Sequence, residues 1–330
     1  MIQIPRLKFA HLPTPVEPLG RLSAYLGGPR IWIKRDDQTG LAFGGNKTRK
    51  LEFLLAEAQA HGARTLITAG AAQSNHCRQT AAAAARFGFK CELVLSVPGN
   101  EGIPPTASGN ILLDRLLGAE IVWTKREERD EKLKDTFTAA WEAGKRPYLI
   151  PYGGSNPTGA AGYVFALQEL LEQELIGTGI PIPDWIVFAS SSGGTQAGLA
   201  LGARLYNYPG NVLGISIDEE QAVLRERVAN LAGKTSELLA SPIQFKPDDI
   251  LVNANFLGKG YGIMGDVEMN AIKLFARHEG ILLDPVYTGR AAGGMLDLIE
   301  KGFFSAHDNV LFWHTGGSPA LFAENYQLIA

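Results

Sequence analysis

Short apolar segments alternate with helical stretches along almost the whole chain, and this alternation limits the possible fold more than any other feature. Apolar runs of strand length are followed by glycine-rich or polar turns and then by helical segments, which is typical of parallel βαβ units. A chain of 330 residues suits two α/β domains or one large one. The segments expected to be strands are 31–35, 65–68, 91–97, 147–151, 185–189, 213–217, 280–283 and 310–313.

Four loops of this chain are rich in glycine or polar residues, and they contain Lys47, Ser74, Gly193 and Gly316. Glycine freedom lets a backbone approach a ligand closely. In an open α/β sheet, ligands bind at the carboxyl ends of the strands, where helix N-termini converge. We therefore expect the four loops to form one site.

Lys47 follows Gly44, Gly45 and Asn46 and stands at the start of an expected helix over 47–60. Backbone N–H groups and the positive end of the helix dipole disfavour an ammonium group at this place. A lysine that loses its proton here can attack a carbonyl group, as Schiff-base lysines do. A solvated lysine in the first helical turn is the alternative reading of this segment alone.

The loop 190–198 leads from an expected strand through serines and glycines into a helix. Free N–H groups and hydroxyls at a helix start suit an anion such as a monophosphate. A turn of small residues that packs the helix tightly on the sheet is the alternative. Because hydroxyl residues are concentrated here, we favour phosphate binding.

Two segments approach nucleotide-binding motifs without the required context. In 40–48, Asn46 occupies the position at which GxxxxGK[ST] requires lysine. Gly260, Gly262 and Gly265 match GxGxxG, but the preceding segment 251–256 is a poor buried parallel strand. Neither an NTPase nor a nicotinamide-dependent dehydrogenase is expected.

Ser74, Asn75, His76 and Cys77 are consecutive, but neighbours in sequence do not make a catalytic triad. Capping of the following helix by Ser74 or Asn75 is as reasonable as a functional role. Cys77 is expected to be a small buried side chain. The six histidines and two cysteines show no usual metal-ligand spacing, so no metal site is expected.

The formal net charge of −3 gives no overall attraction to nucleic acid or to an anionic membrane. Two cysteines are too few for a disulfide framework and indicate a reducing compartment. No secretory apolar segment and no run of about 20 apolar residues is present, so a cytoplasmic protein is expected.

Taken in order, these loops resemble those of pyridoxal-phosphate enzymes of the tryptophan-synthase-β-like fold (fold type II). The match is to the D-cysteine desulfhydrase and 1-aminocyclopropane-1-carboxylate (ACC) deaminase branch. The resemblance implies a two-domain, three-layer αβα protein with twisted, mostly parallel sheets, and usually a homodimer. A large cofactor-binding domain would comprise 1–50 and 159–330, with a small α/β domain, 51–158, inserted in it. The matching segments are 12–15, 34–37, 44–53, 72–76, 192–198, 284–289 and 314–317.

The resemblance also implies residue roles. Lys47 would form the Schiff base with pyridoxal 5′-phosphate, and Asn75 would contact the 3′-oxygen of this cofactor. The phosphate would be bound by Ser192, Gly193, Gly194 and Thr195, and the remainder of the cofactor would also meet Thr288 and Thr315. Substrate would meet Gln73, Ser74, Asn75, Tyr261, Tyr287 and Thr288, with Lys47, Ser74 and Tyr287 taking part in catalysis.

Position 288 distinguishes ACC deaminases from D-cysteine desulfhydrases within this branch. ACC deaminases resemble this chain there, except that glutamate follows the tyrosine and leucine replaces the threonine of the His-Thr-Gly-Gly motif. This chain has Thr288 and Thr315, the desulfhydrase-like pair. A carboxylate would keep the pyridine nitrogen protonated, which a threonine hydroxyl cannot do.

These features predict a small amino-acid substrate and a β-elimination that converts D-cysteine to pyruvate, ammonia and hydrogen sulfide. L-cysteate sulfo-lyase is the first alternative and ACC deaminase a more distant one. A non-catalytic protein that binds the vitamin on the same fold is the alternative from another class.

Overall fold

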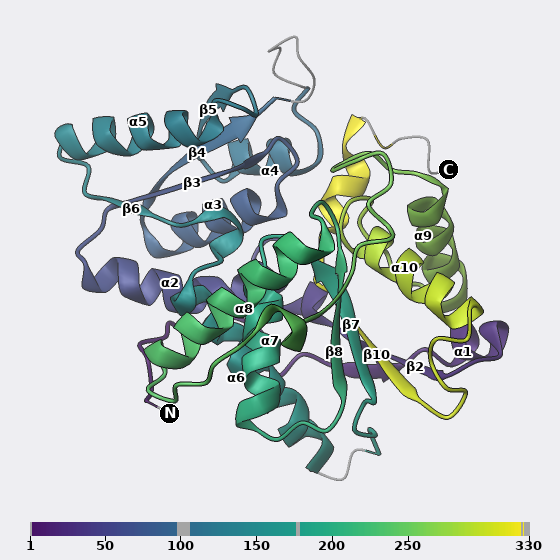
Figure 1. Cartoon of the computed structure of the whole chain (residues 1–330). Coiled ribbons are helices and arrows are strands. Elements are labelled where there is room, and N and C mark those ends of the chain that lie inside the picture. Colours follow the sequence, from purple (N-terminus) through teal and green to yellow (C-terminus); the bar gives the residue numbers. More distant parts are fainter. Residues whose placement is uncertain (1, 98–105, 176–178, 325, 327–330) are drawn as a thin grey trace.

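The computed structural model describes residues 2–97, 106–175, 179–324 and 326, and it contains two β-sheets flanked by helices (Figure 1). Strands and helices alternate along the chain, as the apolar pattern predicted. The predicted class, a mixed α/β fold with mostly parallel sheets, is confirmed. Within the described ranges, no helix is both long enough and apolar enough to cross a bilayer.

The larger sheet has six strands in the order β1-β2-β10-β7-β8-β9. Every neighbouring pair is parallel except β1 and β2, which are antiparallel. The strands are β1 Val16–Pro18, β2 Arg30–Lys34, β7 Trp185–Ser190, β8 Asn211–Ser216, β9 Leu251–Asn253 and β10 Asn309–Trp313.

Helices cover both faces of this sheet (Figure 1). On one face lie α1 (Gly20–Leu26), α9 (Asp266–Glu279) and α10 (Thr288–Glu300), whose apolar side chains pack with those of β2, β7, β8 and β10. On the other face, α6 (Pro157–Leu175) and α7 (Gly194–Leu205) pack on the sheet, and α8 (Gln221–Leu238) packs on both helices. The central strands are therefore buried on both sides, as continuous apolar runs require.

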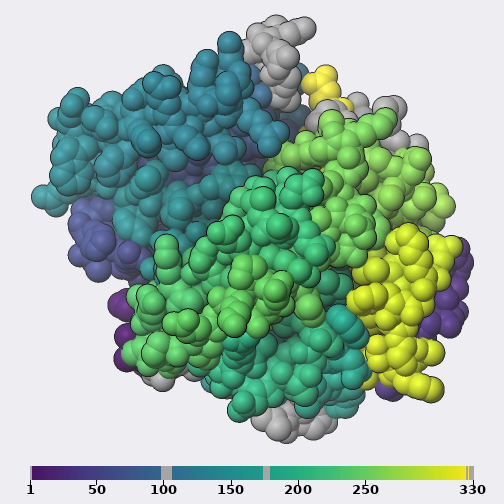
Figure 2. Space-filling view, in the orientation of Figure 1, coloured from purple at the N-terminus to yellow at the C-terminus, as the bar shows by residue number. Residues whose placement is uncertain are grey.

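The smaller sheet has four parallel strands in the order β5-β4-β3-β6. They are β3 Thr65–Ala71, β4 Lys90–Ser96, β5 Glu120–Thr124 and β6 Pro147–Leu149. One face packs against α2 (Asn46–Ala60) and α3 (Asn75–Phe87) and the other against α5 (Arg129–Glu142), while α4 (Gly109–Leu116) contacts α3 (Figure 1). This sheet lies within the predicted inserted domain, 51–158, whose boundaries stay a prediction. The residues of this sheet and of its covering helices lie in the blue and teal lobe at upper left in Figure 2.

The segment 280–283 is not a strand, and this prediction was wrong. Its apolar run resembles a strand, but Gly280 closes α9 in a left-handed conformation and the N–H of Ile281 bonds to Phe275 O. The N–H of Ile281 is therefore bonded to the end of α9 and is not available for pairing with a neighbouring strand. By contrast, 251–253 forms β9, an edge strand beside β8, a position that does not need the apolar run of a central strand.

A buried ion cluster fixes α2 against α6. The Arg49 guanidinium donates to Asp36 Oδ2 and to Glu169 Oε2, each at 2.9 Å. Burial alone would raise the pKa of the Asp36 carboxyl, but Arg49 holds that pKa below its ordinary value. Since Arg49 lies two residues after Lys47, the cluster anchors the helical turn that carries Lys47.

Candidate active site

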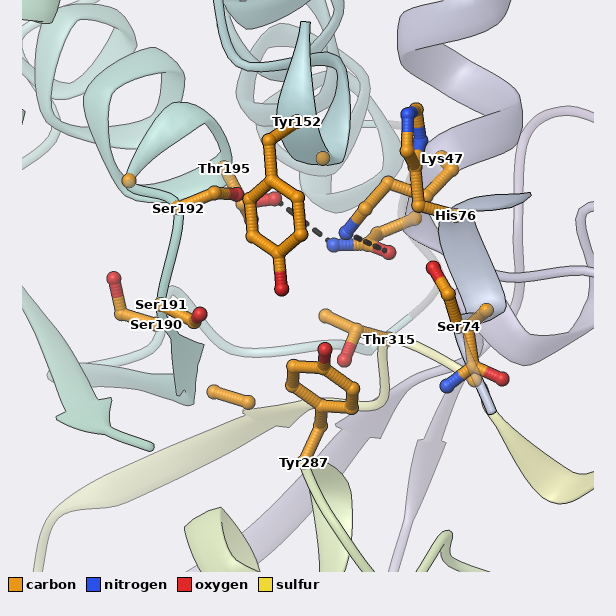
Figure 3. Close-up of a pocket in the computed structure, with 16 residues that line it drawn as sticks. Lys47, Ser74, His76, Tyr152, Ser190, Ser191, Ser192, Thr195, Tyr287 and Thr315 are labelled. Atoms are coloured by element: carbon orange, nitrogen blue, oxygen red, sulfur yellow. Dashed lines mark hydrogen bonds between the residues drawn. The ribbon is translucent and has the colours of Figure 1, made fainter. Parts of the chain in front are cut away.

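A cavity lies between the two sheets, at loops that follow β3, β6, β7 and β10 (Figure 3). It has about 610 Å³ of space, part of it open to solvent. The residues that line it are Asn46, Lys47, Ser74, Asn75, His76, Tyr152, Gly153, Ala189, Ser190, Ser191, Ser192, Gly193, Thr195, Tyr287, Thr315 and Gly316. The four segments singled out in the sequence, which contain Lys47, Ser74, Gly193 and Gly316, thus meet at one cavity, and the loop after β6 joins them.

Lys47 lies in the first turn of α2, and its side chain reaches into the cavity (Figure 3). Its Nζ donates to Asn46 Oδ1 at 3.0 Å, and Asn46 Nδ2 donates to Thr195 Oγ1 at 3.0 Å. Burial lowers the pKa of Lys47 to about 8; Arg78 acts in the same direction, and Asp284 opposes it. The amine is therefore readily available in its neutral, nucleophilic form.

Glycines bring two backbones together beside Lys47. Gly45 has φ = 124° and Gly316 has φ = 83°, both unfavourable for residues with a side chain. A Cβ on Gly316 would stand 2.7 Å from the Cα of Gly45. The N–H of Asn46 donates to Thr315 O at 3.0 Å, which ties the start of α2 to the loop after β10.

The loop between β7 and α7 has the features of a phosphate-binding site. Gly193, with φ = 86°, is the N-cap of α7, so the helix begins at the cavity wall. Ser190 Oγ is buried and has no hydrogen-bond partner within the described residues. A Cβ on Gly194 would lie 2.5 Å from Ser155 Oγ. Bare backbone, hydroxyls and a helix N-terminus together suit an anion.

Lys50 adds a buried amine to this loop, and sequence reasoning missed it. Its Nζ donates to Gly153 O at 3.1 Å and to Ser155 Oγ at 3.2 Å. A Cβ on Gly194 would lie 2.8 Å from this Nζ. Burial, and then the charge of Lys47, lower the pKa of Lys50 well below its ordinary value. The only sequence signal was its spacing of three residues from Lys47, which places both on one helix face.

The N-terminus of α3 forms the facing wall. Ser74 is the N-cap, and its Oγ accepts from Cys77 N at 3.1 Å. The hydroxyl proton remains available to a ligand, so capping and ligand binding are compatible roles. Cys77 itself packs in the apolar core, and burial raises the pKa of its thiol.

His76 also lines the cavity, close to the start of α3. Its Nε2 lies 2.9 Å from Thr68 Oγ1. Burial, and then the charges of Lys47 and Lys50, lower the pKa of His76 well below its ordinary value. The ring is therefore neutral.

Tyr152 and Tyr287 face each other across the cavity (Figure 3). Tyr287 is the N-cap residue of α10, and its hydroxyl lies 2.6 Å from that of Tyr261. Tyr152 projects from the opposite wall, where it follows β6. Sequence reasoning missed Tyr152, although its place after a strand and before Gly153 and Gly154 was a signal.

Thr288 and Thr315 occupy different places. Thr315 lines the cavity, whereas Thr288 is fully buried behind the wall. Thr288 Oγ1 donates to Asp284 Oδ1 at 2.8 Å and accepts from Asp284 N at 2.7 Å. Burial raises the pKa of the Asp284 carboxyl, although hydrogen bonds from the backbone of Thr288 and Tyr287 oppose this effect.

Of the predicted site residues, eight line the cavity: Lys47, Ser74, Asn75, Ser192, Gly193, Thr195, Tyr287 and Thr315. Four do not, namely Gln73, Gly194, Tyr261 and Thr288. Gln73 is turned away, because its Oε1 accepts from Asn110 N at 2.8 Å and its Nε2 donates to Ser108 O at 3.0 Å. The roles of all twelve stay predictions.

A family model described as pyridoxal-phosphate-dependent enzyme matches residues 7–316. The chain belongs to this family. A solved structure of a protein described as an ACC deaminase homologue is 37% identical, with a TM-score of 0.85, over 97% of this chain and 94% of that one.

Two more distant structures share the fold. Threonine deaminase isoform 2 from Solanum lycopersicum is 18% identical, with a TM-score of 0.65, over 92% of this chain and 79% of that one. A pyridoxal 5′-phosphate-dependent aspartate racemase is 16% identical, with a TM-score of 0.65, over 92% and 90% of the two chains. Such low identities establish the fold alone.

Pyridoxal phosphate is the cofactor of this family, and the cavity fits it. The Lys47 amine suits a covalent link to an aldehyde. The bare backbone at Gly194 and the Lys50 amine suit the phosphate group, as does the Ser190 hydroxyl, which has no partner among the described residues. Asn46 links the two regions, because its Oδ1 accepts from Lys47 Nζ and its Nδ2 donates to Thr195 Oγ1.

Proposed function

We propose that this protein catalyses a pyridoxal-phosphate-dependent β-elimination on a sulfur-containing amino acid, with D-cysteine as the first choice. One observation carries the proposal: among the described residues, no aspartate or glutamate lines the cavity. Asp284, the acid that most affects Lys47, accepts hydrogen bonds from the backbone of Val286, Tyr287 and Thr288.

Bound pyridoxal phosphate supplies an electron-withdrawing ring that takes up the negative charge left at Cα after proton removal. A carboxylate beside the ring nitrogen would strengthen this effect by keeping the nitrogen protonated. Thr288 and Thr315 offer only hydroxyls. The weaker effect suits a substrate with a good β-leaving group, such as a thiol with a pKa of about 8.5. It suits the opening of a cyclopropane ring less well.

Lys47 is the group that we assign to the Cα proton. Its pKa of about 8 leaves a useful fraction of neutral amine near neutral pH. Asn46 Oδ1, 3.0 Å away, accepts from the amine and orients it toward the cavity. In its free, neutral form this amine would accept the Cα proton without a second base.

The substrate carboxylate is assigned to the N-terminus of α3. Ser74 uses its oxygen to cap the helix and retains its hydroxyl proton for a carboxylate. The positive end of the helix dipole adds to this attraction. Tyr287, with Tyr261 2.6 Å behind it, lines the part of the cavity assigned to the substrate side chain. The net reaction is cysteine plus water to pyruvate, ammonia and hydrogen sulfide.

The alternatives are L-cysteate, with release of sulfite, and ACC, which is favoured by the 37% identity to the ACC deaminase homologue. Purified enzyme should be incubated separately with D-cysteine, L-cysteine, L-cysteate, D-serine and ACC. Pyruvate is measured in each case, with sulfide or sulfite as the second product. We expect pyruvate and sulfide in equal amounts from D-cysteine. Equal or faster turnover of ACC would overturn the proposal, and no pyruvate from any compound would favour a non-catalytic role.

A further inference from the structure

Among the described residues, the side chain of Asn75 forms hydrogen bonds only through its oxygen. Asn75 Oδ1 accepts from Arg78 Nη1 at 2.9 Å and from Asn110 Nδ2 at 2.9 Å. Its amide nitrogen lies toward Gly317, because a Cβ on that glycine would stand 2.7 Å from Asn75 Nδ2. Asn75 also lines the cavity, and the NH₂ group of its amide lies on the side opposite the oxygen that Arg78 and Asn110 hold.

The two residues that hold this oxygen are fully buried and are themselves fixed. Arg78 Nη1 also donates to Asn110 Oδ1 at 2.8 Å, and Arg78 Nη2 donates to Gly44 O at 2.9 Å. Asn110 Nδ2 donates to Gln73 O at 2.9 Å. The Arg78 guanidinium and the Asn110 amide thus connect α3, α4, the loop before Ser74 and the loop before Lys47.

The chemistry of the two partners sets the direction in which the Asn75 amide points. A guanidinium has five N–H donors and no acceptor, so Arg78 can bond only to the oxygen of that amide. Asn110 presents its NH₂ group to the same oxygen, since its own oxygen accepts from Arg78. A flipped Asn75 would place N–H against N–H at both contacts.

We infer that Arg78 and Asn110 are positioning residues that fix the Asn75 amide with its NH₂ group toward the 3′-oxygen of the cofactor. The inference rests on the proposed contact between Asn75 and that oxygen. A fixed donor stabilises an anionic oxygen, whereas a flipped amide would present its own oxygen and repel it. Neither Arg78 nor Asn110 needs to touch the cofactor for this effect.

The substitution Asn110→Asp tests the polarity with almost no change of volume. The new carboxylate still accepts from Arg78, but when ionised it cannot donate to Asn75 Oδ1 and instead attracts the Asn75 NH₂ group. When protonated, the acid can donate again. We therefore expect pyridoxal phosphate to bind at least tenfold more weakly at high pH, with affinity recovering as pH falls through the pKa of the new acid.

Binding is measured on the full chain by stripping and reloading pyridoxal phosphate across pH, with the visible spectrum of the bound cofactor as a second readout. Asn253→Asp is the matched control, because Asn253 Oδ1 accepts from Asn255 N and an aspartate keeps that bond. Asn110→Ala removes the same donor without adding an acid, so its loss of affinity should not vary with pH relative to wild type.

Two results would overturn the inference. One is wild-type affinity and spectrum for Asn110→Asp at every pH, and the other is an equal, pH-independent loss in Asn110→Asp and Asn110→Ala. Asn75→Ala tests the contact between Asn75 and the cofactor separately from the proposed reaction with D-cysteine. If Asn75→Ala leaves affinity and spectrum unchanged, the assigned contact of Asn75 fails, whatever the enzyme does with D-cysteine.

Discussion

Lys50 Nζ lies 3.2 Å from Ser155 Oγ, which accepts from Gly194 N, so a buried amine stands beside the loop assigned to the cofactor phosphate. Lys50→Met removes this group and keeps most of its volume. Loss of a charge-assisted hydrogen bond costs about 1.5–3 kcal/mol, so pyridoxal phosphate should bind about 10- to 150-fold more weakly. Titration of the stripped protein with the cofactor measures the change.

Lys34→Met is the control for the loss of a buried lysine. Lys34 donates to Thr14 O and pairs with Glu169, and none of these three residues lines the cavity. This variant should unfold more easily but retain its cofactor affinity. Equal affinity losses in both variants would contradict a specific role for Lys50.

The lowered pKa of Lys47 has a consequence for cofactor attachment. Only the neutral amine attacks an aldehyde, so the rate of covalent attachment should rise about tenfold per pH unit well below the pKa. It should level off above about pH 8, where most of the amine is neutral. Absorbance of the bound cofactor follows the rate. A rate that still rises steeply to pH 10 would show that the amine has its ordinary pKa.

Ser74→Ala should affect both stability and substrate use. Loss of the N-cap of α3 costs about 0.5–2 kcal/mol in the free energy of unfolding. Loss of the donor to the substrate carboxylate should lower kcat/KM further, by about tenfold or more. Ser74→Thr retains the hydroxyl and should restore most of both quantities. If Ser74→Ala loses stability alone, the side chain is only a helix cap.

The ion cluster of Asp36 and Arg49 predicts a loss of stability in acid. The Asp36 pKa is lower in the folded protein than its ordinary value of 3.8. The stabilisation is therefore complete above about pH 4 and disappears as pH falls through the lower folded value. Asp36→Asn, which leaves the buried Arg49 without this carboxylate, should cost about 3–5 kcal/mol at pH 7. Denaturant unfolding should show this difference shrinking at low pH.

Local sequence signals were sufficient for much of the fold and for part of the cavity. Lys47 and the loop at 190–195 were recognisable because glycines, hydroxyls and helix starts are adjacent in the chain. The apolar run at 280–283 failed as a strand because the capping of α9 took its backbone donor, a tertiary choice that periodicity does not record.

Lys50, Arg78 and Asn110 were missed for a different reason. Each acquires its meaning from partners distant in the sequence, such as Ser155 for Lys50 and Asn110 for Arg78. A lysine or arginine read alone is most simply a solvated surface charge. Thr288 was assigned to the cofactor by resemblance; its hydroxyl bonds to Asp284 behind the wall, and its role stays a prediction. Assembly as a homodimer, a cytoplasmic location and the domain boundaries also stay predictions.

Reduction of the holoenzyme with borohydride, followed by digestion and mass mapping, tests the central claim most directly. Lys47 lines the cavity, and Lys50, three residues later on α2, has a buried amine bonded to Gly153 O and Ser155 Oγ; only Lys47 is assigned to the covalent link. We predict a reduced pyridoxyl group on the peptide that contains Lys47, at residue 47, with none on Lys50. A label on Lys50, or no label on any lysine, would contradict the assignment.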